Sequence, residues 1–195
     1  MRTATVKRKT TETDINLELN LDGSGKYSVD SGCGFLSHML ELFAAHSHFD
    51  LSLKCKGDVN VDYHHTVEDI GISLGEVLCK ALGEKRGIKR YGTTILPMDE
   101  ALVLVSLDIS GRGFLDYDVS FSGEKVGDMD VELIEEFMAG FSRTAGITLH
   151  IKQLAGKNSH HIIEAVFKAL ARALREATSI DAALDGKIPS TKGIL

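Results

Sequence analysis

A five-residue motif of two histidines and a glutamate occurs twice and constrains the fold more than any other feature of this chain. It is His64-His65-Thr66-Val67-Glu68, and it recurs 96 residues later as His160-His161-Ile162-Ile163-Glu164. A helical pattern of apolar residues follows each copy, over 70–82 and 165–177. Residues three and four apart lie on one face of a helix, so both histidines can approach the glutamate. Duplication at one offset predicts a duplicated fold with two related sites.

The composition of the motif points to metal binding. Two imidazoles and a carboxylate that converge at the start of a helix form a typical ligand set. A single copy would be weak evidence, because paired histidines on a helix are often surface residues. Four of the eight histidines of the chain belong to the two copies, however, and this favours two related metal positions. The predicted ligands from the motifs are His64, His65, Glu68, His160, His161 and Glu164.

Alternating apolar and polar residues predict antiparallel strands in the first half. The clearest alternation runs through Ile15, Leu17 and Leu19, as expected for a half-buried strand. The expected elements of this half are strands at 3–9 and 13–21, a hairpin partner at 26–31 after the turn 22–25, a helix at 35–46, and short strands at 49–56 and 58–62. The second half follows a similar order, with strands at 102–109, 114–121 and 148–153 and a helix at 131–145.

These patterns predict one α+β domain over 1–195, internally duplicated. Each half reads β-β-α-β-β-α, and neither can bury its apolar side alone. We therefore expect the helices of both halves to pack between two mostly antiparallel sheets. The expected boundaries are about 1–90 and 91–187 for the two pseudo-repeats, and 188–195 for a C-terminal tail.

The helices before the two motifs contain a further pair of candidate ligands. His38 lies 26 residues before His64, and Glu136 lies 24 residues before His160. Each could donate one more ligand, although Glu136 belongs to an acidic run of a kind that is usually solvated. The three histidines without a duplicated counterpart are His46, His48 and His150, and His150 is expected to be structural.

Basic residues that could meet an anion are spread along the chain. Lys168 follows Glu164 by four residues, on the same helix face. The segment Ser190-Thr191-Lys192-Gly193 could surround an oxyanion with a hydroxyl, an ammonium and backbone amides. Arg90 and Arg112 complete the set, and each alone would be interpreted as a solvated charge. The chain contains no phosphate-binding loop of the Gly-x-x-x-x-Gly-Lys type and no dinucleotide fingerprint.

Composition excludes several classes of partner. The net charge of −6 argues against a protein that binds nucleic acid. The three cysteines, Cys33, Cys55 and Cys79, lack metal-type spacing, and we expect them to be reduced in a cytoplasmic protein. No apolar run approaches the ~20 residues of a transmembrane helix, so no membrane partner is expected.

Six segments taken together resemble the imidazoleglycerol-phosphate dehydratases. They are 35–40, 64–69, 97–101, 110–112, 158–165 and 189–193. The resemblance spans essentially the whole chain, in order and spacing. It implies the dehydration of D-erythro-imidazole glycerol phosphate to imidazole acetol phosphate and water, in histidine biosynthesis. It also implies a pair of Mn²⁺ ions per active site and a homo-oligomer of 24 subunits with sites between subunits.

The resemblance also implies roles for individual residues. The implied metal ligands are His38, His64, His65, Glu68, Glu136, His160, His161 and Glu164. The implied substrate and phosphate ligands are Arg90, Arg112, Lys168, Ser190, Thr191 and Lys192, with Glu12 offered to the site of a neighbouring subunit. Ser37 and Tyr63 stand where many members of the family carry Asp, and both positions would adjoin metal ligands.

The reaction requires a carboxylate that moves a carbon-bound proton. Our hypothesis assigns this step to Glu164 or Glu68, with Glu12 assisting a water or a hydroxyl. Two alternatives remain open at this point: a non-catalytic assembly protein whose histidines join subunits through metal, and a hydrolase that uses a metal-bound hydroxide. Neither alternative requires a C-terminal anion-binding tail.

Overall fold

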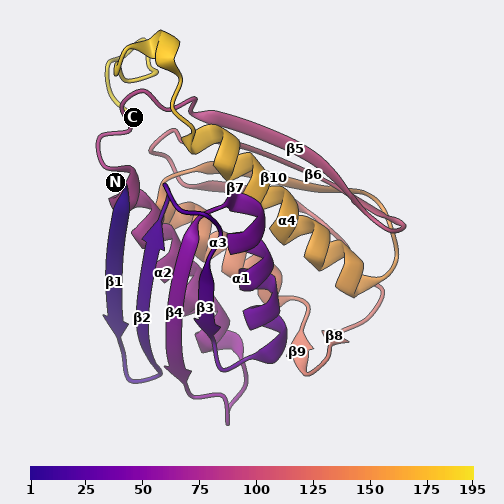
Figure 1. The fold of residues 1–195 in the computed structure, drawn as a ribbon. Coiled ribbons are helices and arrows are strands. Elements are labelled where there is room, and N and C mark those ends of the chain that lie inside the picture. Colours follow the sequence, from indigo (N-terminus) through magenta and orange to yellow (C-terminus); the bar gives the residue numbers. More distant parts are fainter.

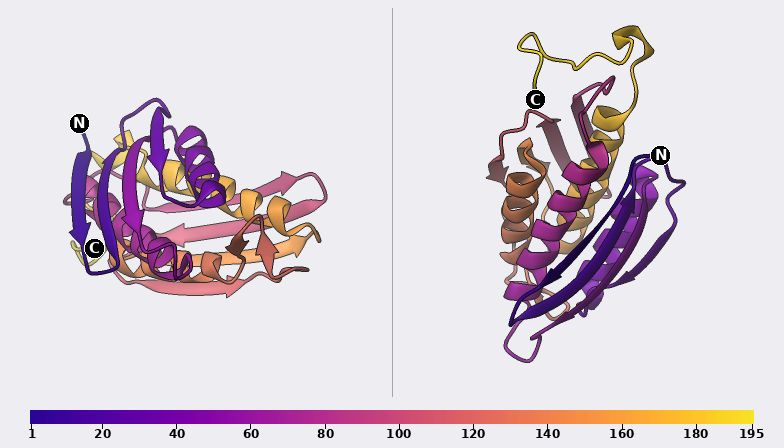
Figure 2. Two further views of the ribbon diagram at one scale, coloured as in Figure 1. Left: turned by 90° about the horizontal axis from the view of Figure 1, so that it is seen from below. Right: turned by 90° about the vertical axis from the view of Figure 1, so that its left-hand side faces the viewer.

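Two four-stranded sheets enclose four helices in a computed structural model that describes residues 1–195 (Figures 1 and 2). The first sheet has the order β1-β2-β4-β3 and the second has the order β5-β6-β10-β7. Only the pairs β3–β4 and β7–β10 are parallel. The strands are β1 (Thr3–Lys9), β2 (Thr13–Asn20), β3 (Tyr27–Asp30), β4 (Asp50–Gly57), β5 (Tyr91–Met98), β6 (Ala101–Asp108), β7 (Phe114–Asp118) and β10 (Thr148–Ala155). The predicted α+β class is confirmed.

The helices fill the space between the sheets. They are α1 (Gly34–Ser47), α2 (His64–Leu82), α3 (Leu133–Ala145) and α4 (Ser159–Thr178). A small hairpin, β8 (Lys125–Val126) and β9 (Met129–Asp130), precedes α3, and a 3₁₀ turn, η1 (Ala182–Leu184), follows α4. One cluster of buried apolar residues contains members of both halves, so the halves share a core. None of the helices is long and apolar enough to span a membrane.

The order of elements within each half differs from the prediction. With the β8–β9 hairpin left aside, it is β-β-β-α-β-α in both halves, rather than β-β-α-β-β-α. The predicted strand at 58–62 is wrong, because this segment is a turn closed by a hydrogen bond of 2.8 Å from the Val61 amide to the Asp58 carbonyl oxygen. Val59 and Val61, which suggested the alternation, are 42% and 64% exposed. Nothing buries their side chains, so no sheet forms there.

Two strands differ from the prediction for tertiary reasons. β3 does not form a hairpin with β2 but pairs in parallel with β4, because α1 provides the crossover that a parallel pair needs. β5 was not predicted. It contains Pro97, which lacks a backbone donor and so argues against a strand. β5 is an edge strand of its sheet, however, and proline is tolerated there.

All four helices begin at the same end of the molecule. Gly71 of α2 lies against Phe137 of α3, and Gly75 lies against Phe141, so these two helices run in the same direction. The strands β4 and β10 lead from α1 to α2 and from α3 to α4, and each strand runs in the direction opposite to the two helices that it connects (Figure 1). Both histidine motifs therefore lie at one end of the helical layer.

Gly71→Ala is expected to destabilise the fold through the contact between α2 and α3. An added Cβ at Gly71 would lie 2.5 Å from the carbonyl oxygen of Phe137. We expect a net loss of about 2 kcal/mol in the free energy of unfolding, because overpacking outweighs the better helix propensity of alanine. Denaturant titration measures the change. Gly123→Ala is the control, since its Cβ would meet no atom closer than 4.0 Å; equal stability of the two variants would contradict the close approach.

Candidate active site

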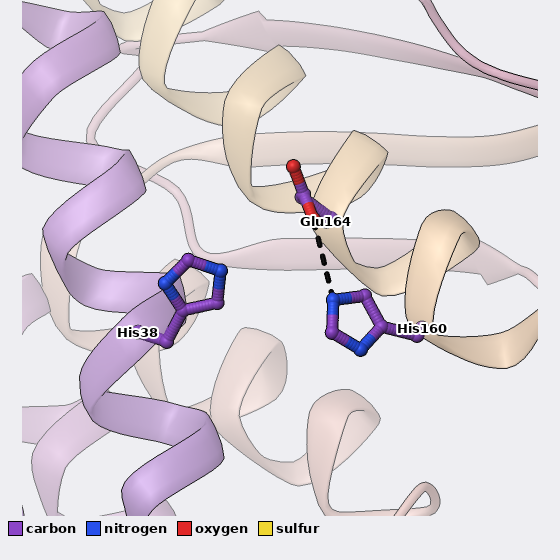
Figure 3. A group of neighbouring side chains, drawn as sticks. All are labelled: His38, His160 and Glu164. Atoms are coloured by element: carbon purple, nitrogen blue, oxygen red, sulfur yellow. Dashed lines mark ion pairs between the residues drawn. The ribbon is translucent and has the colours of Figure 1, made fainter.

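Three potential metal ligands from two helices converge at the end where the helices begin (Figure 3). His38 lies on α1, and His160 and Glu164 lie on the first two turns of α4. Their nearest nitrogen and oxygen atoms all lie within 4.8 Å of one another. His160 Nε2 is 3.3 Å from Glu164 Oε2, and the imidazole centroids of His38 and His160 are 6.3 Å apart. The structure thus brings together candidates that are far apart in the sequence.

Glu164 is the buried member of this cluster, with 8% of its surface exposed. Burial by itself raises the pKa of its carboxyl, but the hydrogen bond and charge of Lys168, with the nearby His160, bring the pKa below its usual value. Lys168 forms an ion pair with Glu164 one helical turn away, as the spacing predicts. The Glu164 carboxylate is therefore ionised at neutral pH, and it can bind a cation or accept a proton.

The second histidine of each motif is held by a carboxylate. His65 Nδ1 lies 3.0 Å from Asp58 Oδ2, and His161 Nδ1 lies 2.7 Å from Glu100 Oε2. These hydrogen bonds raise the pKa of both imidazoles. A proton on Nδ1 leaves the lone pair of Nε2 available to a metal, as in the carboxylate–histidine–metal arrangement. The prediction overlooked Asp58 and Glu100. Asp58 is an acidic residue close to the motif, but Glu100 is 61 residues from His161 and gave no local signal.

The two motifs have closely similar local geometry. The imidazole rings of His64 and His65 are 6.2 Å apart at 83°, and those of His160 and His161 are 6.2 Å apart at 82°. The backbone N–H of His64 donates to Asp62 Oδ1 at 2.7 Å. The corresponding N–H of His160 donates to Asn158 Oδ1 at 2.9 Å. The two copies of the motif thus form the N-termini of α2 and α4 with the same local geometry.

The remaining predicted ligands do not form a second cluster of three within one chain. Glu68 is half-buried on α2, and Glu136 is exposed on the first turn of α3; neither forms an ion pair. His38 and Glu136 nevertheless occupy matching positions. Each helix is followed by a residue in the left-handed conformation, His48 after α1 and Gly146 after α3. His48 lies 10 residues after His38, and Gly146 lies 10 residues after Glu136.

The C-terminal tail lies at the end of the molecule opposite the helix starts (Figures 1 and 2). Arg90 pairs with Asp108 at 2.7 Å and donates from Nη1 to the carbonyl oxygen of Pro189 at 2.9 Å. The Arg90 amide also bonds to Ala177 near the end of α4. At 1.5 Å per residue, Ala177 is about 25 Å along the helix from His160. The histidine cluster is therefore far from the tail residues of the same chain, Ser190, Thr191 and Lys192, and from the neighbouring Arg112.

Glu12 and the two departures from the family pattern all lie near helix starts. Glu12 occupies the turn between β1 and β2, with Oε1 3.7 Å from Nε2 of His65. The Ser37 hydroxyl lies 2.8 Å from that of Ser31. The Tyr63 hydroxyl donates to Asp128 Oδ2 at 2.6 Å, and this bond raises the pKa of Tyr63 to about 12. Tyr63 thus connects the start of α2 to the β8–β9 hairpin.

Comparison with known proteins gives a consistent result. A family model described as imidazoleglycerol-phosphate dehydratase matches residues 31–174. Proteins of that name from Methylorubrum extorquens and Thermoanaerobacter pseudethanolicus are 55% and 59% identical over 195 residues, which is the full length of both chains in each case.

Solved structures of the same enzyme share the fold. The crystal structure of imidazoleglycerol-phosphate dehydratase from Staphylococcus aureus has a TM-score of 0.84 and 41% identity, and the match covers 92% of this chain and 99% of that one. A Pyrococcus furiosus structure in complex with (S)-C348 has a TM-score of 0.84 and 40% identity, covering 97% and 100%. From the motifs, the fold and these matches, the chain belongs to the imidazoleglycerol-phosphate dehydratase family of hydro-lyases, which act in histidine biosynthesis.

Proposed function

We propose that this protein catalyses the metal-dependent dehydration of D-erythro-imidazole glycerol phosphate to imidazole acetol phosphate and water. The observation that carries the proposal is the convergence of His38, His160 and Glu164 at the start of the helical layer. Family membership supplies the reaction class. The convergent histidines and carboxylate supply the reason to expect that the reaction depends on a metal.

The donor set fits Mn²⁺. Two imidazoles and one carboxylate within 4.8 Å suit a borderline divalent ion better than a purely oxygen-preferring one. Nδ1 of His65 and Nδ1 of His161 are each hydrogen-bonded to a carboxylate, so Nε2 of each ring would be the atom that binds a metal. We assign a pair of ions to the residues His38, His64, His65, Glu68, Glu136, His160, His161 and Glu164.

The reaction removes a hydroxyl from the carbon next to the imidazole ring and a hydrogen from the neighbouring carbon. The resulting enol then becomes the ketone. The bound metal would hold the imidazole and hydroxyl groups and draw electron density from them. Glu164, buried and ionised beside Lys168, is placed to take the carbon-bound proton. Glu68 is its counterpart in the first motif, and Glu12 would orient the leaving hydroxyl or a water.

The phosphate requires residues from another copy of the chain. Arg90 and the tail lie about 25 Å from the histidine cluster along α4, which is too far for one small substrate to reach both. We propose that Arg90, Arg112, Ser190, Thr191 and Lys192 of one subunit meet Lys168 and the metal ligands of another. The assembly would have 24 subunits, the number implied by the resemblance. We place it in the cytoplasm, because all three cysteines are free thiols.

The test is a product assay with the purified protein and Mn²⁺. Imidazole glycerol phosphate should be converted to the ketone without release of inorganic phosphate. Phosphate release would instead indicate a hydrolase, and binding without conversion would indicate an assembly protein. His160→Asn should abolish conversion, because it removes a cluster ligand. His150→Asn is the matched control, since His150 also bonds a carboxylate, that of Asp116 at 2.9 Å, but lies on a strand of the second sheet.

A further inference from the structure

The first half of the chain contains a buried polar network that links α2 to the β1–β2 turn. Asp69 follows Glu68 on α2 and is only 6% exposed. It accepts a hydrogen bond from Arg8 Nε at 2.9 Å and another from the Thr13 hydroxyl at 2.5 Å. Thr13 is the first residue of β2 and is itself 3% exposed. Both carboxylate oxygens of Asp69 are thus bonded to the strands that flank the turn.

The network continues into the turn that carries Glu12. The Thr10 hydroxyl oxygen accepts the backbone N–H of Glu12 at 3.1 Å and that of Thr13 at 2.9 Å. It also lies 3.3 Å from the Thr13 hydroxyl. A chain of hydrogen bonds therefore runs from Asp69 through Thr13 and Thr10 to the backbone of Glu12. It determines where the turn sits relative to the start of α2.

The second half replaces both members of the buried pair by alanine. Ala101 is the first residue of β6, as Thr13 is of β2, and Ala165 follows Glu164, as Asp69 follows Glu68. These alanines are 1% and 0% exposed, so the positions are equally buried. The paired replacement shows that these two positions can be buried without polar side chains. The hydrogen bonds of the first half therefore call for another explanation.

The glutamates that precede Thr13 and Ala101 also differ between the two halves. Glu100 precedes Ala101, and its carboxylate accepts from His161 at 2.7 Å and from the backbone N–H of Asn158 at 2.9 Å. Glu12 precedes Thr13 in the equivalent turn, but its carboxylate makes no such bond. It is 47% exposed, and its closest charged neighbour is His65 Nε2 at 3.7 Å. Glu100 is held by hydrogen bonds to its carboxylate, whereas the hydrogen bond that holds Glu12 involves only its backbone N–H.

From this contrast we infer that Asp69 and Thr13 are positioning residues for Glu12. They fix the backbone of the turn, so the Glu12 carboxylate keeps a defined place beside His65. The carboxylate itself accepts no hydrogen bond within the chain. The inference rests on the proposed role of Glu12 in the reaction. The equivalent turns of the two halves then have different roles, because Glu100 orients a metal-binding histidine whereas Glu12 faces the substrate.

A double-mutant cycle on the metal-loaded enzyme tests this. Thr13→Val keeps the shape of the side chain but removes the hydroxyl. We expect kcat to fall about 10-fold in Thr13→Val and about 100-fold in Glu12→Gln. The double variant should be no slower than Glu12→Gln alone, because Thr13 acts through Glu12. Thr13→Ser, which retains the hydroxyl, should keep most of kcat. Thr178→Val, the same change at a threonine that is 2% exposed at the end of α4, should leave kcat unchanged.

Amide hydrogen exchange provides a readout that is independent of turnover. Thr13→Val and Asp69→Asn should speed exchange at residues 10–13 and leave α4 unchanged. Multiplicative losses in the double variant, or wild-type kcat in Glu12→Gln, would overturn the inference while leaving the dehydratase reaction intact. If the wild-type enzyme itself shows no dehydration, the proposed function fails. The exchange data then decide whether Thr13 and Asp69 hold the turn, and unchanged exchange would overturn that as well.

Discussion

Turnover of imidazole glycerol phosphate is expected to fall at least about 10³-fold when the protein is stripped with a chelator, and to return with Mn²⁺. The physical reason is the donor set. Without an ion, His38, His160 and Glu164 present two imidazoles and an anion, but no positive charge to hold the substrate hydroxyls. The measurement is initial rate together with metal content, and about two Mn²⁺ per chain are expected from the duplicated motif.

Calcium provides the matched control for this experiment. Ca²⁺ has the same charge as Mn²⁺ but prefers oxygen ligands in larger shells, so it should restore little activity at a histidine-rich site. Two results would contradict the proposal: full turnover in protein shown to be free of metal, and equal recovery with Ca²⁺. The mass of the stripped and reloaded protein, measured by light scattering, would show in the same samples whether the ions also join subunits.

Glu164→Gln should retain the fold and lose about 10²- to 10⁴-fold in kcat. The amide has nearly the same shape as the carboxylate, but it cannot accept the carbon-bound proton. The substitution also leaves Lys168 without its anionic partner in a largely buried pair, with side chains 16% and 10% exposed. We therefore expect a loss of about 1–3 kcal/mol in the free energy of unfolding. Steady-state kinetics and thermal unfolding measure the two effects.

Metal content distinguishes the two possible roles of Glu164. Loss of turnover with full metal content would assign proton transfer to Glu164, and loss of both would assign it mainly to metal binding. Near-normal kcat with metal retained would remove Glu164 as the proton-transfer group. Glu176→Gln is the control, because Glu176 lies on the same helix near its other end and its carboxylate accepts a hydrogen bond only from the Thr93 amide, at 3.2 Å.

The parts of this protein that the sequence predicts well depend on short distances along the chain. The helical period places His160, Glu164 and Lys168 on one face of α4, and the structure confirms both contacts. Alternation identifies β2, since a half-buried strand shows period 2, and a run rich in Val and Leu identifies β6. The same local rule fails for residues 58–62, where alternation is present but nothing packs over Val59 and Val61.

Only the tertiary structure determines which distant groups meet. The bond from Glu100 to His161 joins residues 61 apart, and the bond from Thr13 to Asp69 joins residues 56 apart. No local pattern encodes such pairs, because they depend on how sheets and helices pack. The same packing separates the predicted anion ligands from the histidine cluster within one chain. The sequence by itself thus determined most of the elements, the duplicated histidine motifs and the family. Only the folded chain shows the convergence of His38 with His160 and Glu164, the parallel pairing of β3 with β4, and the buried hydrogen bonds of Asp69 and Thr13. Each of these features results from contacts between elements.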